Sequence, residues 1–112
     1  MIRIVCIIKP HKLEAVKSAI ANLGVSGMSV SEVRGTGNSE ERATWFGGEQ
    51  QVIALPIRSK LVAVVPDELQ EEIIRAALDA AQTGESGDGK IFVEPVANAV
   101  RIRTLERGAE AI

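Results

Sequence analysis

The stretch Lys60–Val93, KLVAVVPDELQEEIIRAALDAAQTGESGDGKIFV, contains a strand pattern, a helix pattern, a Gly-rich turn and a second strand pattern in that order. Residues 60–65 are rich in β-branched residues, as in a buried strand, and residues 90–93 repeat this character. Pro66 suits the first turn of a helix, and Gly84 suits its end. The helix is indicated by apolar residues that share one face: Leu69, Ile73, Ala77, Leu78 and Ala81.

Three further segments extend this pattern. Residues 2–9 stop at Pro10 and are typical of a buried strand, and residues 28–34 alternate between two faces as a second strand. Residues 99–103 are a short strand candidate, and the strand at 60–65 has an alternative start in the apolar residues of 51–55. A helix before Gly24 is indicated by apolar residues at helical spacing: Leu13, Val16, Ala19, Ile20 and Leu23.

The resulting order β-α-β-β-α-β predicts an α+β fold, the ferredoxin-like βαββαβ sandwich, in which two helices cover one face of the sheet. The strands also carry apolar residues on the other face, namely Val5, Ile7, Val62 and Val64. Because an extended apolar surface marks an interaction site, we expect that face to pack against other subunits.

Composition limits the classes of function. The 112 residues suffice for one domain, 1–112. The 13 Lys and Arg against 15 Asp and Glu give a formal net charge of −2, which argues against nucleic-acid binding through a basic field. No apolar run reaches the ~20 residues that cross a bilayer, and the N-terminus does not resemble a signal peptide. We therefore expect a cytoplasmic protein that is not membrane-embedded.

Cys6 is the only cysteine in the sequence, and His11 is the only histidine. One cysteine excludes an internal disulfide framework and a cysteine-based zinc site within one chain. Cys6 suits a buried strand, and His11, after Pro10, suits a surface or capping position. We expect no metal site and no catalytic residue.

A long segment follows Arg34 and shows no sustained periodicity up to Gln51. Loops of more than about 12–15 residues in a compact domain are usually functional or disordered. Trp45 and Phe46 lie in the middle of this polar segment, before two glycines. They are typical of a mobile arm that anchors a partner, with Arg42 beside them. The alternative is a tolerated insertion.

Residues 84–90 read G-x-x-x-x-G-K, the phosphate-loop pattern. The order of elements is reversed, however, because a helix precedes the loop and a strand follows it, and Ile91 offers no hydroxyl to a metal. Taken alone, the pattern favours a helix end followed by a Gly-rich turn. Its three glycines nevertheless free backbone N–H groups to bind an anion beside Lys90.

Arg101 and Arg103 are two residues apart and would share one face of a strand. Two guanidinium groups and Lys90 near a Gly-rich turn would make a pocket for a polyphosphate. The alternative is a solvated pair bridged to Glu106 or Glu94. The residues alone do not decide between the two.

Residues 83–93, TGESGDGKIFV, closely resemble the C-terminal signature of the PII signal-transduction proteins (nitrogen regulatory protein P-II). The resemblance covers residues 1–35 and 60–112 without gaps. Further matching motifs are Ile7-Ile-Lys-Pro10, Lys12-Leu13, Gly27-Met28, Ser31-Glu-Val33, Gly35-x-Gly37, Val64-Val-Pro-Asp67, Val100-Arg-Ile-Arg-Thr104 and Glu106-Arg-Gly108.

The resemblance implies a homotrimer in which ATP and ADP compete for clefts between subunits. It implies a T-loop at about 36–57 that docks on target proteins, a Gly-rich B-loop at 82–90 and a C-terminal loop at 101–112. By position, the nucleotide-binding residues would be Ser29, Gly35, Gly37, Asn38, Arg58, Val64, Gly87, Asp88, Gly89, Lys90, Arg101 and Arg103. The partner-binding residues of the T-loop would be Arg42, Trp45 and Phe46.

The T-loop departs from the family pattern. Gln51 stands where the family has a Tyr that is often uridylylated, and the chain contains no Tyr, so that modification is excluded. Ser39 replaces a Gln that helps bind magnesium and 2-oxoglutarate, Asn38 replaces an Arg near the terminal phosphate, and Arg58 replaces a Lys that contacts 2-oxoglutarate.

The sequence thus predicts a regulator, not an enzyme, that binds ATP, ADP or AMP and controls a transporter or enzyme of nitrogen and carbon metabolism. Whether Mg²⁺ accompanies the nucleotide is open. The second effector is a small anion, either 2-oxoglutarate or, in a sensor linked to inorganic-carbon handling, bicarbonate. Two other classes remain, a slow ATPase or phosphotransferase and a purely structural trimer.

Overall fold

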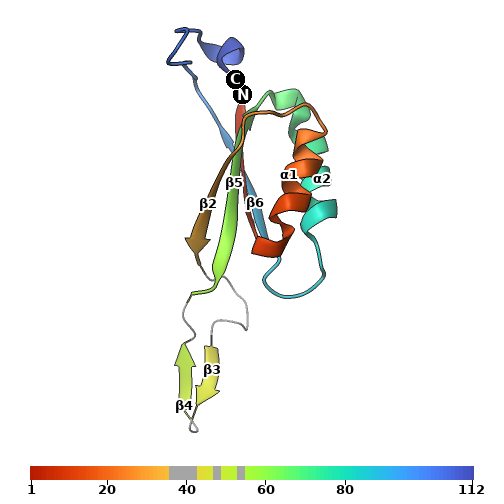
Figure 1. The fold of residues 1–112 in the computed structure, drawn as a ribbon, viewed down its shortest axis with the longest axis vertical. Coiled ribbons are helices and arrows are strands. Elements are labelled where there is room, and N and C mark those ends of the chain that lie inside the picture. The colour runs from red at the N-terminus through yellow and green to blue at the C-terminus, as the bar shows by residue number, and fades with distance from the viewer. Residues whose placement is uncertain (36–42, 47–48, 53–54) are drawn as a thin grey trace.

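The computed structural model describes residues 1–35, 43–46, 49–52 and 55–112. Four strands form one sheet in the order β2-β5-β1-β6, and every neighbouring pair is antiparallel. They are β1 (Ile2–Ile8), β2 (Ser29–Arg34), β5 (Ile57–Val65) and β6 (Gly89–Pro95). Helices α1 (Leu13–Ala21) and α2 (Gln70–Ala81) lie together on one face of this sheet (Figure 1). The ferredoxin-like α+β prediction is confirmed.

Short 3-10 turns complete the chain: η1 (Pro10–Lys12), η3 (Asp67–Leu69) and η4 (Gly108–Ala111). Pro66 therefore precedes a 3-10 turn, and α2 begins only at Gln70. The first helix ends at Ala21, and Gly24 follows with a φ of 89°, a conformation that favours glycine.

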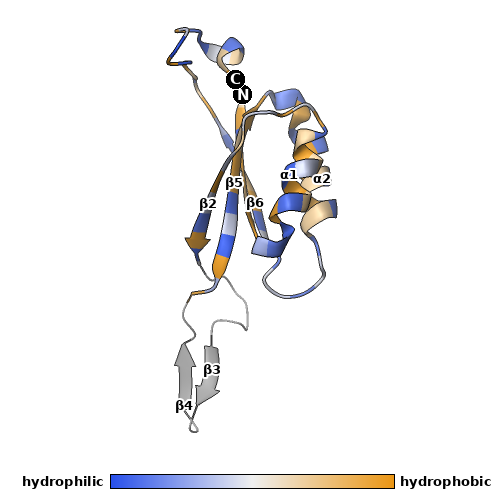
Figure 2. Cartoon of the chain, in the orientation of Figure 1, coloured by the Kyte–Doolittle hydropathy of each residue, from blue (hydrophilic) through white to orange (hydrophobic). Residues whose placement is uncertain are grey.

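The core lies between the helices and the sheet. Alternate residues of β1 and β5 point toward the helices, so Ile4, Cys6 and Leu61 have no exposed surface. From the helices, Val16, Ile20 and Ile73 are also fully covered. In Figure 2 both helices carry apolar and polar stretches, as expected for elements with one buried and one exposed face.

The opposite face of the sheet is covered by no helix of the described chain (Figure 1). The register places Val5 of β1 between Val62 of β5 and Phe92 of β6 on this face. Phe92 is 49% exposed. Arg3 of β1 and Glu94 of β6 lie opposite each other on the same face, and their side chains form an ion pair at 3.0 Å. The sequence correctly placed apolar residues here, and their packing against other subunits remains a prediction.

Two expectations about strands are wrong. The long segment after Arg34 contains a hairpin, β3 (Ala43–Phe46) paired with β4 (Glu49–Val52), in a sheet of its own. Figure 1 shows it beyond the ends of β2 and β5. The alternative start of the third strand within 51–55 is therefore wrong, because Gln51 and Val52 belong to β4 and β5 begins at Ile57.

Residues 99–103 do not form a strand. The chain reverses instead, because Leu105 N–H donates to the Arg101 carbonyl at 2.8 Å and Arg101 N–H donates to the Glu106 carbonyl at 2.9 Å. Leu105 adopts a φ of 65°, and the only bridge outside named strands in the described chain joins Val100 to Arg107. Apart from the single bridge of Val100, the alternating V-R-I-R pattern pairs with no strand in the part of the chain that the structure describes.

Candidate functional site

The Gly-rich loop, residues 82–90, joins the end of α2 to the start of β6. Gly84, Gly87 and Gly89 have φ angles of 85°, 88° and 102°, values that L-residues rarely adopt. Gly89 is also in close contact with β1, since a Cβ there would lie 1.7 Å from the Ile7 carbonyl oxygen. The loop conformation and the start of β6 therefore require glycine.

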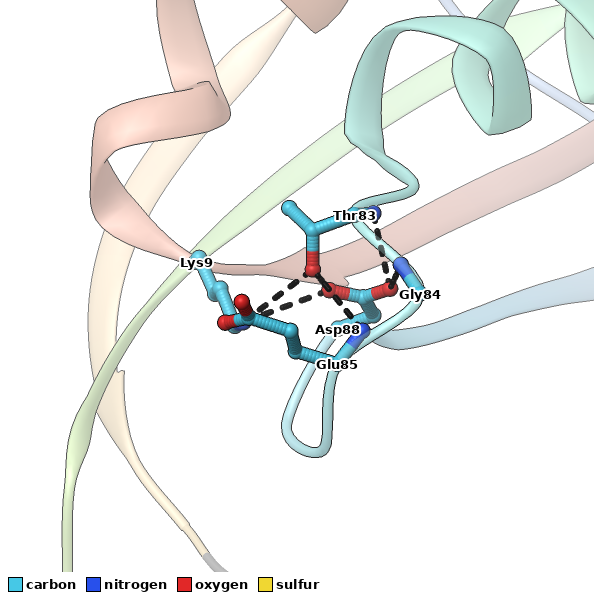
Figure 3. Close-up of polar contacts among 5 residues, drawn as sticks. All are labelled: Lys9, Thr83, Gly84, Glu85 and Asp88. Carbon is cyan, nitrogen blue, oxygen red and sulfur yellow. Dashed lines mark hydrogen bonds and ion pairs between the residues drawn. The ribbon is translucent and has the colours of Figure 1, made fainter.

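The carboxylate of Asp88 folds back onto the start of this loop (Figure 3). One oxygen, Oδ2, accepts the backbone N–H of Thr83 at 2.9 Å and that of Gly84 at 3.0 Å. The other, Oδ1, accepts the Thr83 hydroxyl. The hydrogen bonds from the Thr83 hydroxyl and N–H hold the pKa of Asp88 well below its usual range. The Asp88 side chain is thus ionised and committed to the loop itself.

Lys9, at the end of β1, supplies the cation of this network. Its Nζ lies 3.3 Å from Asp88 Oδ1 and donates to the Thr83 hydroxyl oxygen at 3.4 Å. Glu85, whose side chain is 82% exposed, lies farther away at 3.9 Å. The Lys9 side chain is only 13% exposed. The ammonium group therefore lies inside the network and not on the solvent side of the loop.

The loop leaves groups suited to an anion. Among the described residues, no hydrogen-bond partner is found for the backbone N–H of Ser86 or Gly87. Lys90 is exposed and lies beside Ile7 on the open face of the sheet. Free N–H groups in a turn with a neighbouring ammonium are the groups that bind phosphate oxygens in proteins.

The C-terminal segment that contains Arg101 and Arg103 follows Pro95, the end of β6 away from the Gly-rich loop, and Figure 1 shows this segment beyond that end of the sheet. The six steps from Gly89 to Pro95 span about 20 Å at the usual rise of a strand. A single chain therefore does not bring the two arginines to Lys90. They also do not share a strand face, so that basis for a convergent pocket was wrong.

Arg101 is held within the C-terminal segment. Its guanidinium forms an ion pair with Glu106 at 2.8 Å, and the Thr104 hydroxyl donates to the same carboxylate oxygen at 2.6 Å. The Thr104 hydrogen bond and the Arg101 charge lower the pKa of Glu106. The alternative bridge to Glu106 is thus found for Arg101, whereas Glu94 pairs with Arg3 and Arg103 is exposed.

The other predicted residues fall at both ends of the sheet. Gly35 and Arg58 are at the end near the Gly-rich loop, where Gly35 N–H donates to the Pro56 carbonyl at 3.2 Å. Ser29 is exposed at the start of β2, and Val64 lies near the end of β5. Gly37, Asn38 and Arg42 lie outside the described residues, and Trp45 and Phe46 are described only as backbone of β3.

Sequence reasoning missed the side chains of Lys9 and Thr83. A local signal for Thr83 existed, because a hydroxyl five residues before Asp88 is well placed to close a turn. Lys9 had a weaker signal, a charged residue at the end of a buried strand and before Pro10. Nothing local in the sequence links it to a loop 74 residues away.

The remaining candidates have structural positions. Cys6 is fully covered, and burial raises the pKa of its thiol to about 11. His11 is exposed in η1. Within the described ranges, no three His, Cys, Asp or Glu side chains are grouped as metal ligands would be, and no helix has the length and apolar character to cross a bilayer.

Comparison with known proteins adds two findings. The family model described as nitrogen regulatory protein P-II matches residues 1–106. The chain is 43% identical over 112 residues to the nitrogen regulatory protein P-II of Haemophilus influenzae, with 100% of both chains covered. The same coverage holds for the proteins of that name from Azospirillum brasilense, at 43% identity, and Microchaete diplosiphon, at 41%.

Proposed function

The chain belongs to the nitrogen regulatory protein P-II family of signal-transduction regulators, and on that premise we propose that it binds ATP, ADP or AMP and controls a target protein through residues 36–57. The observation that carries this proposal is the Gly-rich loop. Its N–H groups at Ser86 and Gly87 have no hydrogen-bond partner among the described residues, Lys90 follows a few residues later in the chain, and the Asp88 carboxylate holds the start of the loop. Such a loop fits the phosphates of a nucleotide.

The binding unit we propose is a cleft between two copies of a homotrimer. The Gly-rich loop and Lys90 of one copy would face Arg101 and Arg103 of the next, because β6, which is about 20 Å long, separates these groups within one chain. The sheet face without a helix supports assembly, since Phe92 is 49% exposed there and Val62 is partly exposed, and an exposed apolar surface of this kind is usually an interface. We expect the trimer in the cytoplasm.

Control of the target would pass through the base of the loop. Gly35 and Pro56, which flank residues 36–55, are hydrogen-bonded at the end of the sheet where the Gly-rich loop lies. A nucleotide there would contact Gly35, Gly37, Asn38 and Arg58. It would shift the loop between states by as much as its affinity differs between them. Arg42, Trp45 and Phe46 would contact the target.

Calorimetry tests the nucleotide site. Each of AMP, ADP and ATP is titrated with and without Mg²⁺ into the wild-type protein and the Lys90→Ala and Arg101→Ala variants. Binding should weaken at least tenfold in both variants, as expected when a charged hydrogen bond to phosphate is lost. Lys17→Ala is the control, because Lys17 pairs with Glu14 on the outer surface of α1. Absence of binding to wild-type protein at millimolar nucleotide would refute the proposal.

The second effector is a small anion. Ser39 and Arg58 occupy the places of residues that contact 2-oxoglutarate in the family, so we propose bicarbonate or 2-oxoglutarate and a link to nitrogen or inorganic-carbon metabolism. Titration of each anion in the presence of saturating ADP or ATP separates them. Binding of only one anion would identify it, and a separate nucleotide titration with that anion present should then show tighter nucleotide binding, because coupling between two ligands is reciprocal.

Turnover of the nucleotide is disfavoured by the same geometry. The Asp88 carboxylate accepts three hydrogen bonds from Thr83 and Gly84 and lies beside Lys9, so it is not free to orient a water molecule. Ile91 supplies no hydroxyl for Mg²⁺. Steady phosphate release that is lost in Lys90→Ala would establish a slow ATPase instead.

A further inference from the structure

The Gly-rich loop is closed by a network that links it to the end of β1. The Thr83 hydroxyl is the centre of this network, since it donates to Asp88, accepts the Glu85 N–H at 3.1 Å and accepts Lys9 Nζ at 3.4 Å (Figure 3). Within the described chain, the side chains of Lys9 and Asp88 have hydrogen-bond or ion-pair partners only in residues 83–85 and in each other. We call Lys9, Thr83 and Asp88 the loop latch.

We propose that Lys9 and Thr83 are positioning residues that hold the Gly-rich loop in its anion-binding shape before a ligand arrives. The expected effect on nucleotide affinity rests on the proposed function. The latch itself is a property of the chain without ligand and can be tested separately.

The need for a latch follows from the glycines. A loop with φ angles of 85° at Gly84 and 88° at Gly87 has many other conformations open to it, because glycine restricts the backbone least. The Asp88 carboxylate removes that freedom by taking the N–H groups of Thr83 and Gly84. The Glu85 N–H donates to the Thr83 hydroxyl, and the N–H groups of Ser86 and Gly87 are then left for a ligand. Preorganisation of this kind improves affinity because less conformational entropy is lost on binding.

Lys9 has a second effect, which is electrostatic. The ionised Asp88 carboxylate lies in the loop that would receive phosphate groups, and like charges at short range repel. The Lys9 ammonium, 3.3 Å from Asp88 and largely shielded from solvent, offsets that charge. Loss of Lys9 should therefore weaken binding most for the ligand with the most negative charge. Loss of the Thr83 hydroxyl changes no charge and should affect all nucleotides alike.

The experiment compares Thr83→Val, Thr83→Ser, Lys9→Met and Lys9→Arg with the wild-type protein. Calorimetry gives the affinities for AMP, ADP and ATP, and native mass spectrometry gives the oligomeric state. Lys17→Met is the matched control, because it removes a lysine charge from an exposed pair with Glu14. Amide hydrogen exchange, measured without nucleotide, reports the protection of the Thr83 and Gly84 N–H groups.

We expect Thr83→Val to bind all three nucleotides at least about tenfold more weakly, as for the loss of one hydrogen bond to a charged group. Thr83→Ser should recover affinity to within about twofold, since it keeps the hydroxyl. Lys9→Met should lose affinity in the order ATP, ADP, AMP, and Lys9→Arg should largely restore it. Hydrogen exchange of the backbone N–H groups at positions 83 and 84 should be at least about tenfold faster in Thr83→Val, because the Asp88 carboxylate that accepts them is no longer fixed.

The proposal is wrong if Thr83→Val binds within about twofold of wild type with unchanged exchange at Gly84. It is also wrong if Thr83→Ser is as weak as Thr83→Val, because the hydroxyl would then not be the cause. An equal loss for AMP and ATP in Lys9→Met would overturn the electrostatic role. If wild-type protein binds no nucleotide, the proposed function fails, and hydrogen exchange alone decides whether the latch exists.

Discussion

Replacement of Gly89 by Ala should be much more costly than the same change at another glycine of similar backbone conformation. Gly89 has a φ of 102°, and an added Cβ would lie 1.7 Å from the Ile7 carbonyl oxygen. Gly24 has a φ of 89°, and a Cβ there would meet nothing within 4 Å. The two sites therefore share the backbone penalty and differ in the steric clash.

The magnitude follows from two contributions. An L-residue held at positive φ costs about 1–2 kcal/mol, and this applies to both variants. At Gly89 the clash is with backbone, so β6 must move away from β1 where Gly89 is paired with Ile8. Each strand hydrogen bond lost there costs about 0.5–1.5 kcal/mol. With two such bonds lost, we expect about 2–5 kcal/mol for Gly89→Ala, against about 1–2 kcal/mol for Gly24→Ala.

Urea unfolding followed by circular dichroism measures both changes in the free energy of unfolding. All samples are compared at one protein concentration, because assembly would make stability depend on it. If Gly89→Ala is within about 0.5 kcal/mol of Gly24→Ala, the close contact between β6 and β1 is not as the structure describes it. A large loss in Gly24→Ala would instead contradict the shared backbone penalty.

Three further predictions concern the core, the thiol and the loop. Leu61→Ala, at a fully buried position of β5, should lower the free energy of unfolding by about 2–5 kcal/mol, and Leu78→Ala, 48% exposed on α2, by less than about 1 kcal/mol; equal losses in urea unfolding would contradict the assigned core. Alkylation of Cys6 at pH 8 should be far slower than that of a free thiol, because its pKa is about 11 and it is buried; rapid labelling of native protein by mass spectrometry would disprove this. Because the pKa of Asp88 is depressed in the folded chain, its stabilising contribution is present above the ordinary carboxyl pKa of about 3.9 and is lost as pH falls through the folded value. The NMR shift of the Thr83 amide should therefore stay constant down to about pH 4 and change only below it, whereas a midpoint near 3.9 would indicate a carboxylate without the latch.

The fold could be predicted because hydropathy repeats at the period of each element. Strands β1, β2, β5 and β6 and both helices lie where the pattern put them, since their buried faces must be apolar. The same rule fails for residues 99–103. Their alternation is that of a strand, but Ile102 is 92% exposed and the segment belongs to neither sheet of the described residues.

The candidate site was predictable only in part. The glycines and Lys90 are close in sequence, so their proximity follows from local structure alone. Lys9 directly follows the first strand, and its contact with Thr83 depends on β1 and β6 being neighbours. The separation of Arg101 from Lys90 likewise depends on the length of β6, which the sequence pattern of 90–93 underestimates by three residues against Gly89–Pro95.

The hydrogen bond between Gly35 and Pro56 has a consequence for how this chain can change. The two ends of residues 36–55 are fixed at one point of the sheet, so the entropy of closing the loop depends only weakly on its length. The sheet therefore places little constraint on the length or sequence of this segment. Its sequence can be exchanged for another while the framework that carries it stays intact. Asn38, Ser39 and Gln51, which depart from the family pattern, all lie within this segment.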